Sequence, residues 1–259
     1  MSEKITKQAI LRSDLKSFTT ARVALDKTGC SETTATSLAF KMAHAAAKDA
    51  VQSSMNNSKL TSFLAAQQID FLELYSAAID KTTYLQRPDL GRKLSETSRK
   101  LLENTAYAPA DLCIVVADGL SSKAVHEQFT KLILPLLQEL KTANISYSPI
   151  CLTTLGRVAI ADEIGHLLKS KASLILIGER PGLSSPDSLG AYITLNPKPG
   201  NTDESRNCIS NIRPQGLSFE LAAAKICYLL QAAFEKQYSG VALKDNFDPQ
   251  QWLSERSQH

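Results

Sequence analysis

The sequence predicts an α/β protein in which a helical N-terminal region precedes a Rossmann-like, mostly parallel, doubly wound α/β domain. Upstream of residue 108, apolar residues recur with the period of an α-helix. Residues 112–117, "LCIVVA", form a short apolar run rich in β-branched residues, which is typical of a strand covered on both faces. Beyond it, strand-like and helix-like segments alternate. We therefore divide the chain into a flexible or amphipathic N-terminal segment (1–20), a helical region (21–108) and an α/β domain (109–259).

Helices are expected throughout the N-terminal region. Ser31 is the candidate N-cap of the Ala-rich segment "SETTATSLAFKMAHAAAKDAVQ", residues 31–52. The segments "LTSFLAAQQIDFLELYSAA" (60–78) and "PDLGRKLSETSRKLLENT" (88–105) continue the helical pattern. Pro88 suits the first position of a helix, where no backbone N–H is needed.

The elements of the α/β domain follow from the alternation of apolar runs and amphipathic stretches. The last helical stretch is apolar almost all round, which indicates a buried position. In chain order we expect a strand at 112–117, a helix at 122–141, a strand at 145–152, a helix at 157–170, strands at 173–178 and 191–196, and a helix at 217–235.

A Gly-Leu-Ser sequence occurs three times, in "DGLSSKA" from Asp118, "PGLSSPD" from Pro181 and "QGLSFEL" from Gln215. We interpret it as a capping signal in which Gly ends one element and Ser caps the next helix. Helices that begin near Ser121 and Ser184 would point their backbone N–H groups toward a ligand.

Composition and charge argue against several classes of function. The 259 residues carry a net charge of +3 without a cluster of Lys and Arg, so no nucleic-acid partner is expected. No apolar run approaches the length of a membrane span, so no membrane partner is expected. The five cysteines are dispersed without a C-x-x-C pair, which suggests reduced thiols in a cytosolic compartment. The four histidines show no metal-ligand spacing, so no metal site is expected.

Motifs of common catalytic sites are missing from the sequence. It has no G-x-S-x-G nucleophile elbow, no Walker phosphate loop and no G-x-G-x-x-G dinucleotide fingerprint. The residues alone therefore indicate a binding domain without an obvious reaction centre.

Polar residues lie at the ends of three predicted strands. Asp118 follows the first strand, Cys151 lies at the end of the second, and Glu179 and Arg180 follow the third. Ligands of open parallel sheets bind outside the carboxyl ends of the strands, so these residues are expected to share one rim. Two other interpretations stay open: Glu179 and Arg180 pair with each other, and Asp118 belongs to an Asp-Gly turn.

Long strings of residues carry a resemblance to a known family. They are "RVAIADEIG", "LILIGERPGLSSPDSLGAYIT" and "NTDESRNCISNIRPQGLSFELAA", together with "ARVALDKTG", "AHAAAKDAV", "LQRPDLGRKL" and "IVVADGLSSKAV". These strings extend over about residues 21–245. On their strength the chain resembles the small (light) subunit of ethanolamine ammonia-lyase.

The resemblance implies a part in an adenosylcobalamin-dependent ammonia-lyase, a carbon–nitrogen lyase that converts ethanolamine to acetaldehyde and ammonia by a radical route. In this family a large subunit with a TIM-type barrel holds the substrate and supplies the catalytic side chains. The small subunit covers the barrel mouth, and the corrinoid lies between the two subunits of a hetero-oligomer. This chain would then carry no catalytic residue and no ligand to cobalt. The absence of a D-x-H-x-x-G motif agrees, because the family's cofactor keeps its own base on cobalt.

Carried over residue by residue, the resemblance places cobalamin contacts at Val158, Glu179 and Cys208. A corrinoid is a wide, mostly apolar disc fringed by amide arms, so it needs apolar contact and a few hydrogen-bonding groups. Glu179 can accept hydrogen bonds from amides, Val158 can pack on the ring edge or the nucleotide base, and Cys208 can fill space. Val158 and Cys208 can equally be core residues. Rim position alone adds three second-tier candidates: Asp118, Arg180 and Arg206.

The resemblance also implies a location. Enzymes of this family are commonly packed into bacterial microcompartments through short N-terminal helices, and the stretch from Ile5 to Leu15 is the candidate contact with the shell. The expected location is therefore cytoplasmic, within a microcompartment for ethanolamine degradation; a frayed terminus is the alternative for this segment. Two other functions stay open for the whole chain: a stand-alone α/β regulatory or carrier module that binds a nucleotide-like ligand at the same rim, and a structural shell or scaffold subunit.

Overall fold

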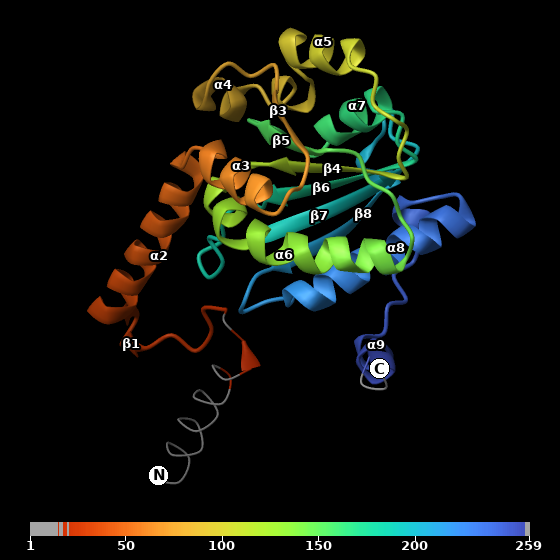
Figure 1. Ribbon diagram of the computed structural model, residues 1–259. Helices are drawn as coiled ribbons and strands as arrows, with labels where there is room; N and C mark the ends of the chain where they lie inside the picture. The colour runs from red at the N-terminus through yellow and green to blue at the C-terminus, as the bar shows by residue number, and fades with distance from the viewer. Residues whose placement is uncertain (1–14, 16–17, 20, 257–259) are drawn as a thin grey trace.

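A six-stranded sheet with helices on both faces forms the centre of the computed structural model, which describes residues 15, 18–19 and 21–256 (Figure 1). The first four strands in spatial order are parallel, β7 is antiparallel to β6, and β8 is antiparallel to β7. The predicted α/β class with a mostly parallel sheet is thereby confirmed. The strand order is β3 (Phe71–Tyr75), β5 (Ile150–Thr154), β4 (Leu112–Ala117), β6 (Ala172–Gly178), β7 (Leu189–Leu195) and β8 (Arg206–Ile212).

Alternate side chains of the central strands enter two hydrophobic cores, one on each face of the sheet. In β4, Ile114 and Val116 pack into the core beneath α6 (Ser122–Thr142), α8 (Phe219–Lys236) and α3 (Asn57–Ala66). Cys113 and Val115 point the other way, into the core beneath α7 (Ile160–Leu167) and α5 (Glu96–Asn104). Burial on both faces explains why β4 is a continuous apolar run and why β6 is one from Leu174 onward.

Serines of the first and third Gly-Leu-Ser copies cap two long helices, as predicted. The Ser121 hydroxyl accepts a hydrogen bond from Ala124 N at 3.2 Å and caps α6. Ser218 caps α8 in the same way, through Leu221 N. The second Gly-Leu-Ser copy starts no helix, so the prediction of a helix N-terminus near Ser184 is wrong.

Helix α2 (Thr34–Gln52) begins later than predicted. Its N-cap is Thr33, whose hydroxyl accepts from Thr36 N, whereas Ser31 lies in β2 (Ser31–Glu32), the partner of β1 (Lys27–Thr28). Pro88 likewise begins no α-helix, because α4 (Lys81–Gln86) ends before it and α5 is capped by Ser95. Both corrections have one reason: a hydroxyl that reaches a backbone N–H three residues on defines the helix start.

The helical prediction for residues 60–78 is correct only as far as Ala66. Gln68 adopts a left-handed backbone with φ +56°, which ends the helical path, and Phe71–Tyr75 then form β3 at the edge of the sheet. Because β3 pairs with β5 in parallel, the region before residue 108 contributes a strand to the sheet. The division into a helical region and an α/β domain stays a prediction.

Two further differences concern strand bounds. β5 begins at Ile150, directly after Pro149, rather than at residue 145. β8 was not predicted, because polar and exposed residues interrupt its apolar ones.

The proposed shell contact from Ile5 to Leu15 lies outside the described residues except for Leu15, whose side chain is exposed.

Candidate functional site

A cleft of about 430 Å³ opens at the carboxyl ends of β4, β5 and β6. The chain leaves β4 for α6 on one face of the sheet and leaves β5 for α7 on the other, which is the arrangement at which open sheets bind ligands. The three strand ends and their loops contribute most of the lining, and α4 and β7 complete it. The lining residues are Tyr84, Gly119, Leu120, Arg157, Val158, Ile177, Gly178, Glu179, Arg180 and Tyr192.

Glu179 stands at the cleft with its carboxylate held in place. Its Oε2 accepts hydrogen bonds from the Ser188 hydroxyl and, at 3.3 Å, from the backbone N–H of Asn211. Gly190 makes room for this side chain, since a Cβ there would lie 2.9 Å from Glu179 Oε1. Among the described residues no ion pair joins Glu179 to Arg180, so the structure favours a held carboxylate over the pairing left open above.

Asp118 lies just behind the cleft rather than in its lining, and its residue is only 1% exposed. Its Oδ1 accepts from Gly156 N at 3.1 Å, and its Oδ2 is 4.0 Å from Lys81 Nζ. Burial raises the pKa of Asp118 to about 6, against the lowering effect of the Lys81 charge. The Asp-Gly turn is also present, with Gly119 at φ +55° and Ser121 N donating to Asp118 O.

Val158 and Cys208 occupy different parts of the site. Val158 is half-buried; it packs against the core beneath α7 and also lines the cleft. Cys208 is exposed on β8, opposite Tyr192 in the register of β7, and Tyr192 lines the cleft. Partial burial and, to a smaller extent, the charge of Glu179 raise the pKa of the Cys208 thiol, while a hydrogen bond with Tyr192 lowers it. Cys208 therefore lies beside the cleft.

The two second-tier arginines fall in different places. Arg180 is exposed and lines the cleft. Arg206 begins β8 at the end of the strands that lies away from the cleft. Its Nη1 is 2.8 Å from the buried Asp162 carboxylate and 3.1 Å from Thr194 Oγ1. The structure thus does not bring Arg206 to the cleft, because β8 begins at the amino ends of the parallel strands.

Sequence reasoning missed Tyr84, Arg157 and Lys81. Tyr84 is fully buried, and its hydroxyl donates to Gly156 O at 3.3 Å. The Arg157 guanidinium carbon lies 4.3 Å from the centroid of the Tyr84 ring, and Lys81 Nζ lies 5.0 Å from it. Arg157 lies in the loop that follows β5, so the strand-end rule could have found it. No sequence signal marks Tyr84 and Lys81, which reach the site from α4 through the tertiary fold.

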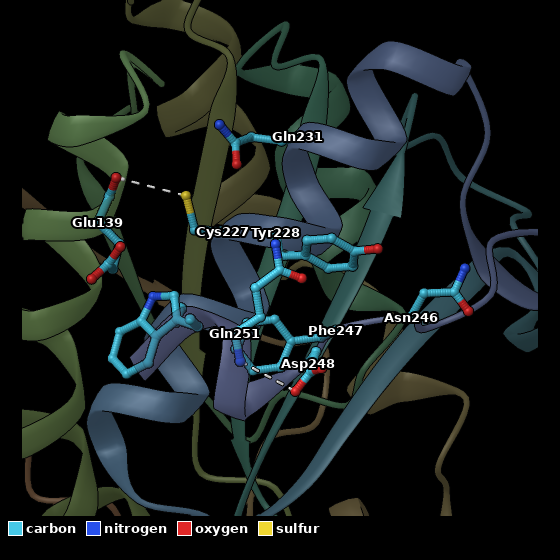
Figure 2. A pocket seen from close by; sticks show the side chains of 10 residues that line it. Glu139, Cys227, Tyr228, Gln231, Asn246, Phe247, Asp248 and Gln251 are labelled. Carbon is cyan, nitrogen blue, oxygen red and sulfur yellow. Dashed lines mark hydrogen bonds between the residues drawn. The ribbon is translucent and has the colours of Figure 1, made fainter. Parts of the chain in front are cut away.

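Figure 2 shows a second pocket, of about 250 Å³, between α6, α8 and the segment that leads into α9 (Pro249–Arg256). The Cys227 thiol donates to the Glu139 carbonyl at 3.6 Å, and burial raises its pKa to about 11. The rings of Tyr228 and Phe247 lie 5.7 Å apart. This pocket holds none of the predicted site residues and lies on the face covered by α6 and α8.

The described part of the chain contains no cluster of three His, Cys, Asp or Glu side chains that could hold a metal ion. Within the same residues, no helix combines the length and the apolarity needed to cross a bilayer.

Comparison with known proteins identifies relatives along almost the whole chain. The family model described as "Ethanolamine ammonia-lyase light chain (EutC)" matches residues 11–244. A protein of Pseudomonas fluorescens (strain Pf0-1) named ethanolamine ammonia-lyase small subunit is 49% identical over 245 residues, which cover 93% of this chain and 89% of the relative. Proteins with the same name from Azotobacter vinelandii (51% over 234 residues, 89% and 87% covered) and Pseudomonas aeruginosa PAO1 (49% over 239 residues, 91% and 88% covered) are similarly close.

Proposed function

The chain belongs to the ethanolamine ammonia-lyase light-chain family and is thus a subunit of a lyase, and from this premise we propose that it binds adenosylcobalamin jointly with the large subunit of that enzyme. In this proposal the chain contributes one wall of the cofactor site and the large subunit contributes the other wall and the catalytic side chains. The observation that carries it is the cleft at the carboxyl ends of β4, β5 and β6, to which the structure brings Val158, Glu179 and Arg180 together.

The chemistry of the cleft suits a corrinoid. Leu120, Val158 and Ile177 offer apolar surface to the ring, and the held carboxylate of Glu179 can accept hydrogen bonds from amide arms. Lys81 Nζ and Arg157 Nε are buried without a hydrogen-bond partner in the described chain, so donor capacity is left unused beside the cleft. A volume of about 430 Å³ holds only part of a wide disc, which supports a site shared by two proteins.

The division of labour follows from the same residues. Among the described residues that line the cleft, Glu179 is the only carboxylate, and its Oε2 already accepts two hydrogen bonds. Adenosylcobalamin supplies the radical chemistry when bound, and this chain would bind it and exclude water from the reactive species. A subunit with this role needs no general acid or base of its own.

Helix α2 supports a hetero-oligomer. Only Ala50 of its 19 residues is buried, and Leu38, Phe40 and Met42 are exposed to 54, 41 and 74%. In Figure 1 the helix extends away from the sheet. Leu38 and Met42, four residues apart, share one side of the helix, and exposed apolar side chains there are suited to burial against another protein. We assign this helix to the contact with the large subunit. The N-terminal segment remains our candidate for a microcompartment contact.

Reconstitution tests the proposal. The purified chain, the large subunit and their mixture are assayed for ethanolamine deamination with added adenosylcobalamin. Full activity is expected only from the mixture, with cofactor retained by the complex on gel filtration. Lyase activity from this chain alone, or full activity and cofactor retention by the large subunit alone, would contradict the assignment. Binding of a nucleotide by the isolated chain, without effect of the large subunit, would favour the carrier-module alternative.

A further inference from the structure

Two guanidinium groups line the cleft without a counter-ion. Within the part of the chain that the structure describes, no carboxylate lies within ion-pair distance of Arg157 or Arg180. Glu179, the carboxylate of the lining, is engaged by Ser188 and Asn211 instead. This wall of the cleft therefore carries an excess of positive charge that an anionic ligand group would neutralise.

Arg157 is held in position before any ligand arrives. Its guanidinium lies over the Tyr84 ring, and its Nη2 donates to the Tyr84 carbonyl at 3.1 Å. Its backbone N–H donates to Gly91 O at 2.8 Å, and Gly91 has no side chain to displace it, since a Cβ there would lie 2.7 Å from Arg157 Cγ. A guanidinium fixed in this way loses little conformational entropy on binding an oxyanion.

Lys81 places a second cation near the Tyr84 ring. Its Nζ is buried and has no hydrogen-bond partner in the described chain, and the carboxylate oxygen paired with it, Asp118 Oδ2, is 4.0 Å away. Burial and the positive charge of Arg157 lower the pKa of Lys81, while Asp118 raises it. The two cations therefore repel each other, and an anion beside them would relieve this repulsion.

We propose that the wall formed by Arg157 and Arg180, with Lys81 buried behind it, binds the phosphodiester group of the cofactor. This inference rests on the proposed function, because adenosylcobalamin carries one phosphodiester, in the loop that joins its corrin ring to its nucleotide base. The planar guanidinium of Arg157 matches phosphate oxygens with two parallel donors, Arg180 adds charge at the mouth, and Lys81 strengthens the field from behind. Glu179 would repel a phosphate, so the amide arms of the ring lie on its side of the cleft.

Three corrinoids serve as probes, and each contains one part of the ligand more than the one before. Cobinamide has the ring and the amide arms, cobinamide phosphate adds the phosphate, and cobalamin adds the nucleoside as well. The complex of this chain with the large subunit is titrated with each, and the absorbance of the corrin ring reports binding. Arg157→Gln is expected to weaken cobalamin and cobinamide phosphate about 10- to 100-fold and to leave cobinamide unchanged, because only the first two present a charged acceptor.

Two other variants make the experiment decisive. Arg180→Gln changes an exposed side chain, which keeps folding intact, and is expected to show the same pattern with a smaller effect. Arg87→Gln removes a guanidinium that pairs with Asp89 outside the cleft, and should alter none of the three affinities. Thermal melting and gel filtration confirm folding and assembly for each variant.

The outcomes distinguish this inference from the function on which it rests. Equal weakening of all three corrinoids, weakening of cobalamin alone, or no change in either cleft variant would overturn the phosphodiester assignment and leave the shared site standing. Loss of assembly with the large subunit in Arg157→Gln, at unchanged affinity of the remaining complex, would show instead that this wall meets a partner carboxylate and would likewise overturn it. Failure of the wild-type complex to bind any of the three would contradict the proposed function itself.

Discussion

The buried carboxylate of Asp118 accepts a hydrogen bond from the backbone N–H of Gly156, with 3.1 Å between Oδ1 and N. This contact joins the loop after β4 to the loop after β5. Since Gly156 directly precedes Arg157 and Val158, Asp118 positions two residues of the cleft without lining it. Asp118 directly follows β4, so its place in the sequence suggests a ligand contact. Its side chain is buried behind the lining instead.

Asp118 makes stability depend on pH. Its pKa in the fold, about 6, lies above the ordinary 3.8, so its contribution to stability is fully present below about pH 3.8 and is lost as the pH rises through about 6. Asp118→Asn lacks this titration. The free energy of unfolding of the wild type minus that of the variant should therefore fall by on the order of 2–3 kcal/mol between about pH 4 and pH 7. Urea unfolding over this range measures it, and a constant difference would contradict the burial of an ionisable Asp118.

Replacement of Glu179 tests the cofactor contact. Glu179→Ala removes the acceptor that faces the cleft, and the affinity of the assembled complex for cobalamin should fall by about 1–3 kcal/mol, the usual cost of an unmade polar contact. Equilibrium titration measures this change. Glu235→Ala, on the exposed surface of α8, is the matched control and should bind as the wild type does. An unchanged dissociation constant in Glu179→Ala would remove Glu179 from the site.

The ion pair of Asp162 and Arg206 is expected to serve stability rather than binding. Asp162→Asn leaves a buried guanidinium without its closest counter-ion, which should reduce the free energy of unfolding by about 3–5 kcal/mol. Glu127→Gln breaks the exposed pair with Lys123 and should cost no more than about 0.5 kcal/mol. Urea unfolding compares the two. A large loss of cobalamin affinity in folded Asp162→Asn would show that Arg206 reaches the ligand after all.

Helix α2 is expected to form the contact with the large subunit. Met42→Glu places a charge on a side chain that is 74% exposed, so the melting temperature of the isolated chain should not change. Burial of that charge in an interface would be costly, and assembly should weaken at least about tenfold. Analytical ultracentrifugation of mixtures gives the affinity. Normal assembly of Met42→Glu would place the interface elsewhere; Lys48→Glu, on an exposed residue of the same helix, controls for the added charge.

Strong local patterns predicted most elements of the α/β domain. β4 is apolar along its whole length and β6 is apolar from Leu174 onward, and α6 and α8 start at serines that cap them. The composition of β3 predicts helix, because its few half-buried residues follow a helical stretch without a break in composition. β8 was missed because its outer face is polar. β3 and β8 are the two edge strands of the sheet, and edge strands gain much of their stability from pairing, which leaves little trace in local periodicity.

The candidate site was predictable to the extent that strand ends determine it. Glu179 and Arg180 follow β6 and were found by that rule, and Arg157 follows β5 and was within its reach. Tyr84 and Lys81 could not be found, because they lie about seventy residues upstream of Arg157 and reach the cleft only when β3 adds to β5 and brings α4 with it.

The sequence by itself determined the class of fold, the family and the loops that meet at one edge of the sheet, because apolar periodicity, capping hydroxyls and long matching strings are properties of neighbouring residues. Only the tertiary structure decided which side chains share the cleft. It placed Asp118 behind the lining and stacked Arg157 on Tyr84. It also placed Arg206 in an ion pair with Asp162, away from the cleft. The physical reason is that strand order and direction arise from contacts between distant segments, and these set the edge at which each side chain emerges.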